Sequence, residues 1–409
     1  MSGIDNKMQK LFDSGVRRSR SLFYGLECVN GFRRALFWSL ILLFFLSLGV
    51  PLLSVTTLFA FSSVVMILFE FPTGAFADHY SRRTSVLISF FLMFVSFFGF
   101  SLFQNFWILA FFFVLQDVAW TFQSGTTTAW IIDELRIGKH QKKIVSIFSW
   151  FYFFEKFGGI LGGVLGFFVA PFGFRFVWLS VAVLNMVLFF ILYKYMEERH
   201  FSSSPVDSKI IFHTFVKVGE SLRFLFHVKS GSVRGLALAM FLVTVALTSV
   251  SVVVPLLLSG KFQMGNEYIA GLSTLFGVVL LCSPFFGSFV AHRFGVRKSL
   301  VCMSIVMCVL IFLFSVAGSI VSAVGILLFF YFFDTSLGTV HDSAAQFSLS
   351  SSTRASIGSL MGIVWGVGHS VGSFFTGLSI VVLGMSFTLS IVGLLFLVSA
   401  VVYVRSLKG

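Results

Sequence analysis

Long apolar segments alternate with short polar connections along almost the whole chain. A helix that crosses the hydrocarbon core of a bilayer needs about 20 predominantly apolar residues. Twelve segments reach this length, at residues 24–48, 54–77, 84–104, 107–131, 144–169, 174–195, 235–258, 268–291, 299–317, 320–345, 356–380 and 383–404. The pattern therefore predicts an all-α membrane protein whose twelve transmembrane helices leave little chain for a soluble domain.

One long polar stretch separates the twelve spans into two groups of six. The predicted domains are an N-terminal six-helix half at residues 1–195, a cytoplasmic linker at 196–234 and a C-terminal six-helix half at 235–409. Apolar residues recur in the linker at steps of four and three, at Ile211, Phe215, Val218, Leu222 and Leu225. This spacing predicts an amphipathic helix at the membrane surface, which either couples two moving halves or only attaches the linker to the bilayer.

The composition is that of a protein surrounded by lipid. Of the 409 residues, 57% are hydrophobic and 11% are charged, so the chain has too little polar surface for a soluble globule. The four cysteines form no CxxC pair and have no histidine at zinc-binding spacing. We therefore expect no disulfide framework, no metal site and no cofactor.

The net charge of +13 reflects an uneven distribution of Lys and Arg between the connections. With both termini in the cytoplasm, only Arg175 and Lys261 lie outside, and Arg33, Arg34 and Lys156 fall within spans; every other Lys and Arg lies on the cytoplasmic side. This asymmetry is the positive-inside pattern of a multi-pass membrane protein, which we expect to lie in a plasma membrane. It accounts for the positive charge without a nucleic-acid partner.

Similar polar segments follow the second and the eighth spans. The first contains Gly74, Asp78, Arg82 and Arg83, whereas the second, at 287–298, repeats the glycine and the basic cluster but lacks the aspartate. An internal repeat of six-helix units is typical of transporters in which one half rocks against the other around a central site. The two predicted halves are therefore expected to be pseudo-symmetric bundles.

The first of these segments resembles the signature loop of the major facilitator superfamily, with Ser81 and His79 in place of the usual glycine and basic residue. The segments Phe69–Gly74 and 124–135 resemble patterns of a bacterial drug-efflux-like branch of that superfamily. The resemblance implies the twelve-helix fold of the superfamily and a latch in which Asp78 helps to hold the outward-open state. The alternative is that the charges of the loop only anchor it at the membrane surface.

Three cations are predicted inside the spans, namely Arg33 and Arg34 in the first and Lys156 in the fifth. An ionisable group near the centre of a bilayer costs at least about 2.5–3.5 kcal/mol, so each must be paired, hydrated or functional. One interpretation is that these cations hold an anionic or zwitterionic part of a substrate. The other is that they form internal ion pairs, Arg34 with Glu27 and Lys156 with Asp117.

Four carboxylates within the predicted spans are candidates for proton coupling. They are Glu27 in the first span, Asp117 in the fourth, Glu155 in the fifth and Asp334 in the tenth. A carboxylate that is shielded from water can take up and release a proton near neutral pH, as proton exchange requires. In the resembled fold, these spans mostly line the central cavity.

Glycines recur at four-residue spacing in the fifth span, at Gly158, Gly162 and Gly166. Such spacing lets two helices approach closely. The segment resembles the glycine-rich motif of proton-driven exporters of the superfamily, except that Gly163 and Phe167 stand where that motif has proline and glycine. The packing role is retained, and the two departures count against the implied export.

A transporter accounts for the repeat, the signature loop and the buried charges together. No nucleophile with a base and no metal-type cluster indicates catalysis, so we predict neither an enzyme nor catalytic residues. The leading hypothesis is a monomeric secondary transporter that works by alternating access, is coupled to protons and exports an amphipathic small molecule. The alternatives are uptake or exchange of an organic anion and, in a different class, a non-transporting receptor or sensor on the same fold.

Overall fold

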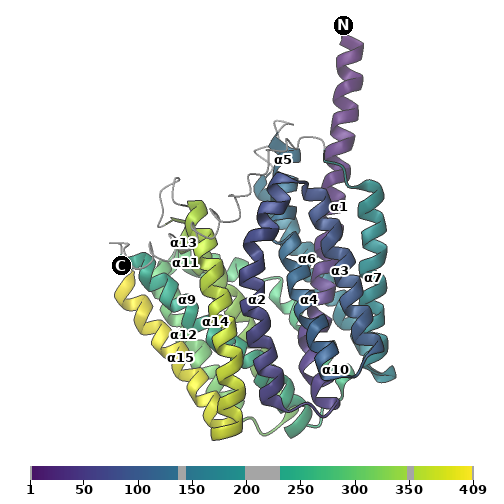
Figure 1. The fold of residues 1–409 in the computed structure, drawn as a ribbon. Helices are drawn as coiled ribbons and strands as arrows, with labels where there is room; N and C mark the ends of the chain where they lie inside the picture. The colour runs from purple at the N-terminus through teal and green to yellow at the C-terminus, as the bar shows by residue number, and fades with distance from the viewer. Residues whose placement is uncertain (1, 137–143, 199–230, 348–353, 408–409) are drawn as a thin grey trace. The chain divides into compact units, whose positions relative to one another are not determined.

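A computed structural model describes residues 2–136, 144–198, 231–347 and 354–407. Helices account for nearly all of these residues, and this part of the chain contains no β-strand (Figure 1). Twelve helical segments are long and apolar enough to cross a membrane by their length and composition. The prediction of an all-α membrane protein with twelve transmembrane helices is therefore confirmed.

The described residues up to residue 198 form seven α-helices and one short 3-10 turn. The elements are α1 (Ser2–Ser47), α2 (Leu52–His79), α3 (Arg82–Leu102), α4 (Phe106–Gln123), α5 (Thr126–Arg136), α6 (Ile144–Val169), a 3-10 turn (Ala170–Phe172) and α7 (Phe174–Tyr195). The hydroxyl of Ser81 accepts a hydrogen bond from the amide of Thr84 at the start of α3, and Asn105 caps α4 through its side-chain oxygen. These caps satisfy amides that the start of a helix leaves without partners.

The later part of the chain continues in the same way. Its elements are α9 (Gly231–Leu256), a π-helical turn (Leu257–Lys261), α10 (Asn266–Leu280), α11 (Ser283–Phe294), α12 (Val296–Ser315), α13 (Ile320–Phe347), α14 (Arg354–Leu383) and α15 (Met385–Ser406). Gly295 and Gly384 stand at sharp turns into α12 and α15, with φ of 87° and 82°. Glycine is suited to these turns because it has no Cβ to disfavour positive φ.

Contacts between residues divide the described chain into two compact units. Within the described residues, the first unit contains α1 up to Phe37 and the chain from Leu68 to residue 198. The second contains Trp38–Ile67 and the chain from Gly231 onward. Helices α1 and α2 thus contribute to both units, and the division of the sequence into two six-helix halves stays a prediction.

Three helices differ locally from the predicted pattern. Helix α1 begins at Ser2 and not near residue 24, because the polar residues before the apolar stretch continue the helix without a proline to end it. The fourth span is broken at Gly125, whose φ is 69°, and the eighth is broken after Leu280, where Pro284 opens α11. The amphipathic helix predicted for the linker lies outside the described residues.

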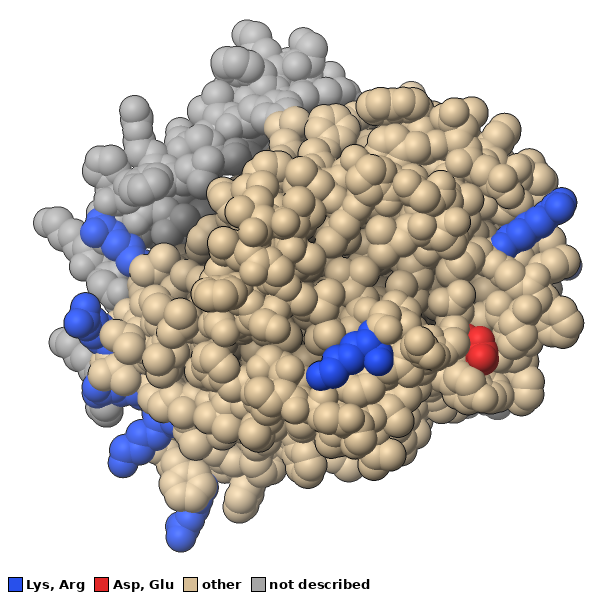
Figure 2. Space-filling view, turned by 90° about the horizontal axis from the view of Figure 1, so that it is seen from below, with Lys and Arg blue, Asp and Glu red and all other residues tan. Residues whose placement is uncertain are grey.

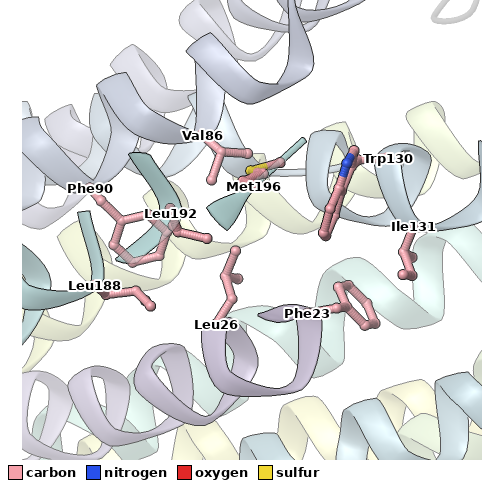
Figure 3. Packing of buried hydrophobic residues seen from close by; sticks show 9 residues of the cluster. All are labelled: Phe23, Leu26, Val86, Phe90, Trp130, Ile131, Leu188, Leu192 and Met196. Carbon is pink, nitrogen blue, oxygen red and sulfur yellow. The ribbon is translucent and has the colours of Figure 1, made fainter. Parts of the chain in front are cut away.

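Figure 3 shows a cluster of buried apolar side chains in the first unit. The nine residues are Phe23, Leu26, Val86, Phe90, Trp130, Ile131, Leu188, Leu192 and Met196. They lie on α1, α3, α5 and α7 or, for Met196, directly after α7. Trp130 also donates its indole N–H to the backbone oxygen of Glu197 at 3.0 Å. This packing fixes the short helix α5 and places its polar residues for the contacts described below.

Candidate transport site

Helices α1 and α6 approach each other closely where both carry glycines. A Cβ atom on Gly158 would overlap the carbonyl oxygen of Cys28, and one on Gly31 would overlap the carbonyl oxygen of Glu155. A Cβ atom on Gly162 would also press on the backbone of α1. Because the two backbones are nearly in contact, the charged side chains of α1 lie directly beside those of α6.

Glu155 of α6 is the carboxylate that joins two of the predicted cations. Its Oε1 atom lies 3.2 Å from Arg34 Nη2 and 3.6 Å from Lys156 Nζ. The guanidinium of Arg34 also lies 5.3 Å from the centre of the Trp120 ring on α4, within the range of a cation–π interaction. Arg34 therefore connects α1 with both α6 and α4.

Arg33 is the most deeply buried cation of the three, with only 2% of its surface exposed. Its guanidinium lies 5.3 Å from the centre of the Trp120 ring, and the negative charges of Asp117 and Glu27 act on it. Its Nε and Nη2 atoms are buried and have no hydrogen-bond partner among the described residues. Buried N–H donors of an arginine without partners are costly, and an anionic acceptor would satisfy them.

Glu27 is the buried carboxylate of the same region, with 3% of its surface exposed. Its side chain is hydrogen-bonded to Asn30, and Gln123 of α4 donates to Asn30 Oδ1 at 3.2 Å. The negative charge of Glu155 repels that of Glu27, whereas Arg34 attracts it. Glu27 is thus held between cations, a second carboxylate and a polar bridge to α4.

The groups on these three helices are formally balanced in charge. We call them the charge cluster: Arg33, Arg34 and Lys156 with Glu27, Asp117 and Glu155. When one carboxylate binds a proton, the cluster gains an excess positive charge and a cation loses part of its compensation. Protonation is therefore linked to the contacts that hold α1, α4 and α6 together.

The ion pair of Arg34 in the structure differs from the one that the helical spacing predicted. Arg34 forms its ion pair with Glu155 on α6 and not with Glu27 on its own helix, among the residues that the structure describes. Sequence spacing shows which residues share a face of one helix, but it does not show which neighbouring helix that face meets. Asp334 lies on α13 in the second unit, where it is half-buried and its charge acts on Tyr331.

Two contributors on α4 were not predicted. Trp120 lies beside both arginines, and Gln123 bonds to Asn30. Both follow Asp117 at steps of three residues, a spacing that places them near one face of the helix and could have identified them. Gly166, the third predicted packing glycine, is buried further along α6.

A second polar network lies where α2 ends and α3 begins. Arg82 contacts Asp133 of α5 through Nη1, and its Nη2 lies 3.6 Å from Asp78 Oδ1. The carboxylate of Glu198 accepts one hydrogen bond from the hydroxyl of Ser81 and one from the amide of Arg82, both at 2.7 Å. The loop is therefore tied to α5 and to the segment after α7.

Arg83 and Gly74 are the remaining residues of the predicted loop. Arg83 Nη2 donates to the backbone oxygen of Tyr193 at 2.5 Å. Gly74 lies inside α2, where an added Cβ atom would meet no other atom within 4 Å. Four residues earlier on α2, Glu70 Oε1 accepts a hydrogen bond of 2.7 Å from the hydroxyl of Ser124, at the break between α4 and α5. This bond joins the two segments that carried the resemblance to one bacterial branch.

We expect Asp78 to contribute little to the stability of this network and Arg82 to contribute more. The Asp78 side chain is 65% exposed, so Asp78→Asn should lower the free energy of unfolding by less than about 1 kcal/mol. The Arg82 side chain is 17% exposed and meets two carboxylates, so Arg82→Ala should cost about 1.5–3 kcal/mol. Unfolding of the purified protein by SDS titration measures both, and equal losses would contradict the assignment.

A histidine in the second unit has a defined polar and aromatic environment. His369 Nδ1 lies 3.0 Å from the hydroxyl oxygen of Ser63, and its ring contacts those of Trp38 and Trp365 at centroid distances of 5.6 and 5.3 Å. The preceding residue on α14, Gly368, packs closely against the side chain of Thr244 on α9. Among the described residues, no group of three or more His, Cys, Asp or Glu could hold a metal ion.

A comparison with known protein families identifies the family of this chain. The family model of the Major Facilitator Superfamily matches residues 23–376, which is most of the chain. The chain belongs to this superfamily. Its twelve apolar helices make it a multi-pass integral membrane protein of this superfamily, and the resemblance of its signature loop is confirmed at the level of the superfamily.

One curated relative is the uncharacterized MFS-type transporter YxaM of Bacillus subtilis (strain 168), which is 22% identical over 212 residues. The match covers 51% of this chain and 51% of YxaM, so the chain spans about half the length of that relative.

Solved transporter structures have a similar fold. The nucleoside transporter NupG aligns with a TM-score of 0.77 and 13% identity over 96% of this chain and 100% of its own. The POT family transporter PepTSo aligns with a TM-score of 0.76 and 13% identity over 95% and 97%. At such low identity, these similarities support the fold alone.

Proposed function

We propose that this transporter exchanges protons for an amphipathic small solute by alternating access, and that it exports the solute. Membership of the superfamily supports a transporter rather than an enzyme. Export is suggested by the glycine-rich sequence around Gly158 and Gly162, which resembles that of proton-driven exporters although Gly163 and Phe167 depart from their motif. In this proposal, Asp78 and Arg82 form a latch that holds the outward-open state.

The observation that carries proton coupling is the burial of Glu27 within the charge cluster. This carboxylate is shielded from water and is influenced by Arg33, Arg34 and Glu155 at once. A proton on Glu27 removes the negative charge that compensates the arginines, so the proton and a cationic or dipolar part of the solute compete for the same environment. Such competition is the physical basis of exchange.

Flux in proteoliposomes tests this proposal, with ethidium as the amphipathic probe and the membrane potential clamped. A pH difference of about one unit is worth about 1.4 kcal/mol per proton and sustains about a tenfold solute gradient at one-to-one exchange. We expect wild type to accumulate ethidium in response to the pH difference. Glu27→Gln should still bind and equilibrate the probe but should no longer concentrate it.

The matched control is Glu267→Gln, the same chemical change in the first turn of α10. It should keep the response to the pH difference. Asp117→Asn and Asp334→Asn separate the contributions of the other candidate carboxylates. A wild-type flux that is indifferent to the pH difference for all probes would rule out proton coupling.

Uptake or exchange of an organic anion is the second candidate function. It is supported by the buried Nε and Nη2 atoms of Arg33, which have no hydrogen-bond partner among the described residues. The same vesicles loaded with benzoate distinguish the two functions, because an anion carrier would exchange benzoate and leave ethidium in place. A receptor or sensor on this fold would move neither probe.

The charge pattern also supports a proposal for the cellular setting. The positive-inside distribution of Lys and Arg supports cytoplasmic termini in a bacterial inner membrane. The solute pathway of the proposal requires one chain, so the transporter is proposed to act as a monomer.

A further inference from the structure

An open apolar groove lies between α1, α6 and α7 in the first unit. Its volume is about 850 Å³. Cys28 and Phe32 line it from α1, Leu165 from α6, and Phe176 and Val183 from α7. This volume lies within the range of about 300–1,000 Å³ that is typical of sites for small organic molecules. The lining is almost entirely apolar, so the groove suits a hydrocarbon chain.

The length of the groove matches one leaflet of a bilayer. Its residues on α7 run from Phe176 to Val187, which corresponds to about 16 Å of helix. The hydrocarbon core of a bilayer is about 30 Å thick, so the groove extends from one surface to about its middle. Phe172, in the connection between α6 and α7, lines the end at the membrane surface.

The groove is open on the side of α7. The exposed fractions of Phe176, Val183 and Val187 are 51%, 53% and 48%. These three residues lie in a predicted span, where exposure means contact with lipid and not with water. A lipid chain can therefore enter the groove sideways from the surrounding leaflet.

A cation stands at the surface end of the groove. Arg175 is exposed in the first turn of α7, directly before Phe176, which lines the groove. The start of α7 adds the positive end of the helix dipole, and its cap Gly173 supplies no side-chain hydrogen bond. Seen from below, the described residues of Figure 2 are mostly uncharged, with a few Lys and Arg side chains among them. The end of the groove thus complements a negatively charged headgroup.

We propose that this groove binds one acyl chain of an anionic phospholipid from the leaflet at the α6–α7 connection, with the headgroup phosphate beside Arg175. The apolar lining suits an acyl chain, and the length of the groove matches the depth of one leaflet. The cation at the surface end suits the headgroup phosphate. An amphipathic transport solute would fit the lining equally well, but it would not require a site that is open along its length to the leaflet. The proposal is independent of proton coupling and of the solute.

Native mass spectrometry of the detergent-purified full chain tests the proposal. The probes are phosphatidylglycerol and phosphatidylcholine with identical oleoyl chains, and glycerol 3-phosphate as a headgroup without chains. Val183→Trp fills the groove, and Ile191→Trp is the matched control because Ile191 is also exposed on α7 but does not line the groove. Ser180→Phe fills the groove with a smaller ring and serves if the first variant does not fold.

Wild type should retain phosphatidylglycerol in preference to phosphatidylcholine and should not bind glycerol 3-phosphate. Filling the groove should lower the fraction with bound phosphatidylglycerol about tenfold, a change of about 1.4 kcal/mol. Ile191→Trp should bind as wild type does, and Arg175→Gln should abolish the preference between the two lipids. Undiminished binding in both groove variants, or an equal loss in Ile191→Trp, would overturn the proposal. Binding of glycerol 3-phosphate as tight as that of phosphatidylglycerol would also overturn it.

Discussion

Arg33→Met is expected to abolish transport and to lower the free energy of unfolding by about 3–5 kcal/mol, because a buried charge that loses its partner is left uncompensated. Arg33 is 2% exposed, and the charges of Glu27 and Asp117 depend on it for compensation. The double variant Arg33→Met with Glu27→Gln removes one charge of each sign. It should regain most of the lost stability but none of the transport.

Arg34→Met is the matched control for this prediction. The Arg34 side chain is 35% exposed, so the same substitution should cost less stability than it does at Arg33. Unfolding by SDS titration gives the stabilities, and probe flux in proteoliposomes gives the activity. If the double variant transports as wild type does, the charge cluster only holds the helices together.

Gly158→Ala is expected to separate α1 from α6 and to reduce transport strongly, although it adds a single methyl group. That methyl group would overlap the backbone oxygen of Cys28, which cannot move without displacing α1. Overpacking of this kind costs about 1–3 kcal/mol or more. Because Arg34 on α1 contacts Glu155 on α6 at 3.2 Å, displacing α1 would also disturb this ion pair.

The neighbouring position provides the control. An added Cβ atom at Gly159 would have its nearest contact at 3.8 Å, so Gly159→Ala should fold and transport as wild type does. Thermal unfolding and flux of the two variants are compared in the same vesicles. Equal behaviour of Gly158→Ala and Gly159→Ala would show that the contact between α1 and α6 does not position the site.

The sequence was sufficient to predict the twelve spans. Hydropathy detects a span because a membrane helix needs about 20 predominantly apolar residues. A charged residue in a span is rare because it is costly in lipid, so Arg33 and Arg34 stand out in the sequence. The break at Gly125, whose φ is 69°, was not predicted because one glycine in an apolar run changes the hydropathy very little.

Partner choice was the part that the sequence did not determine. The contact of Arg34 with Glu155 depends on the rotation of α1 against α6, and their distance is set by glycine backbones on both helices. Glu198 was placed in a polar linker, yet its carboxylate binds the start of α3. The sequence around such a carboxylate, just beyond an apolar stretch, does not show whether it binds another helix or only belongs to a loop.

The central claim is that solute and protons move in exchange through the charge cluster. Its most direct test is the reciprocal measurement, in which an imposed ethidium gradient drives protons across proteoliposomes that begin with equal pH on both sides and a clamped membrane potential. Wild type is predicted to move protons against the direction of the solute, and Glu27→Gln is predicted to move solute without protons. Proton movement in Glu27→Gln equal to that of wild type would contradict the account.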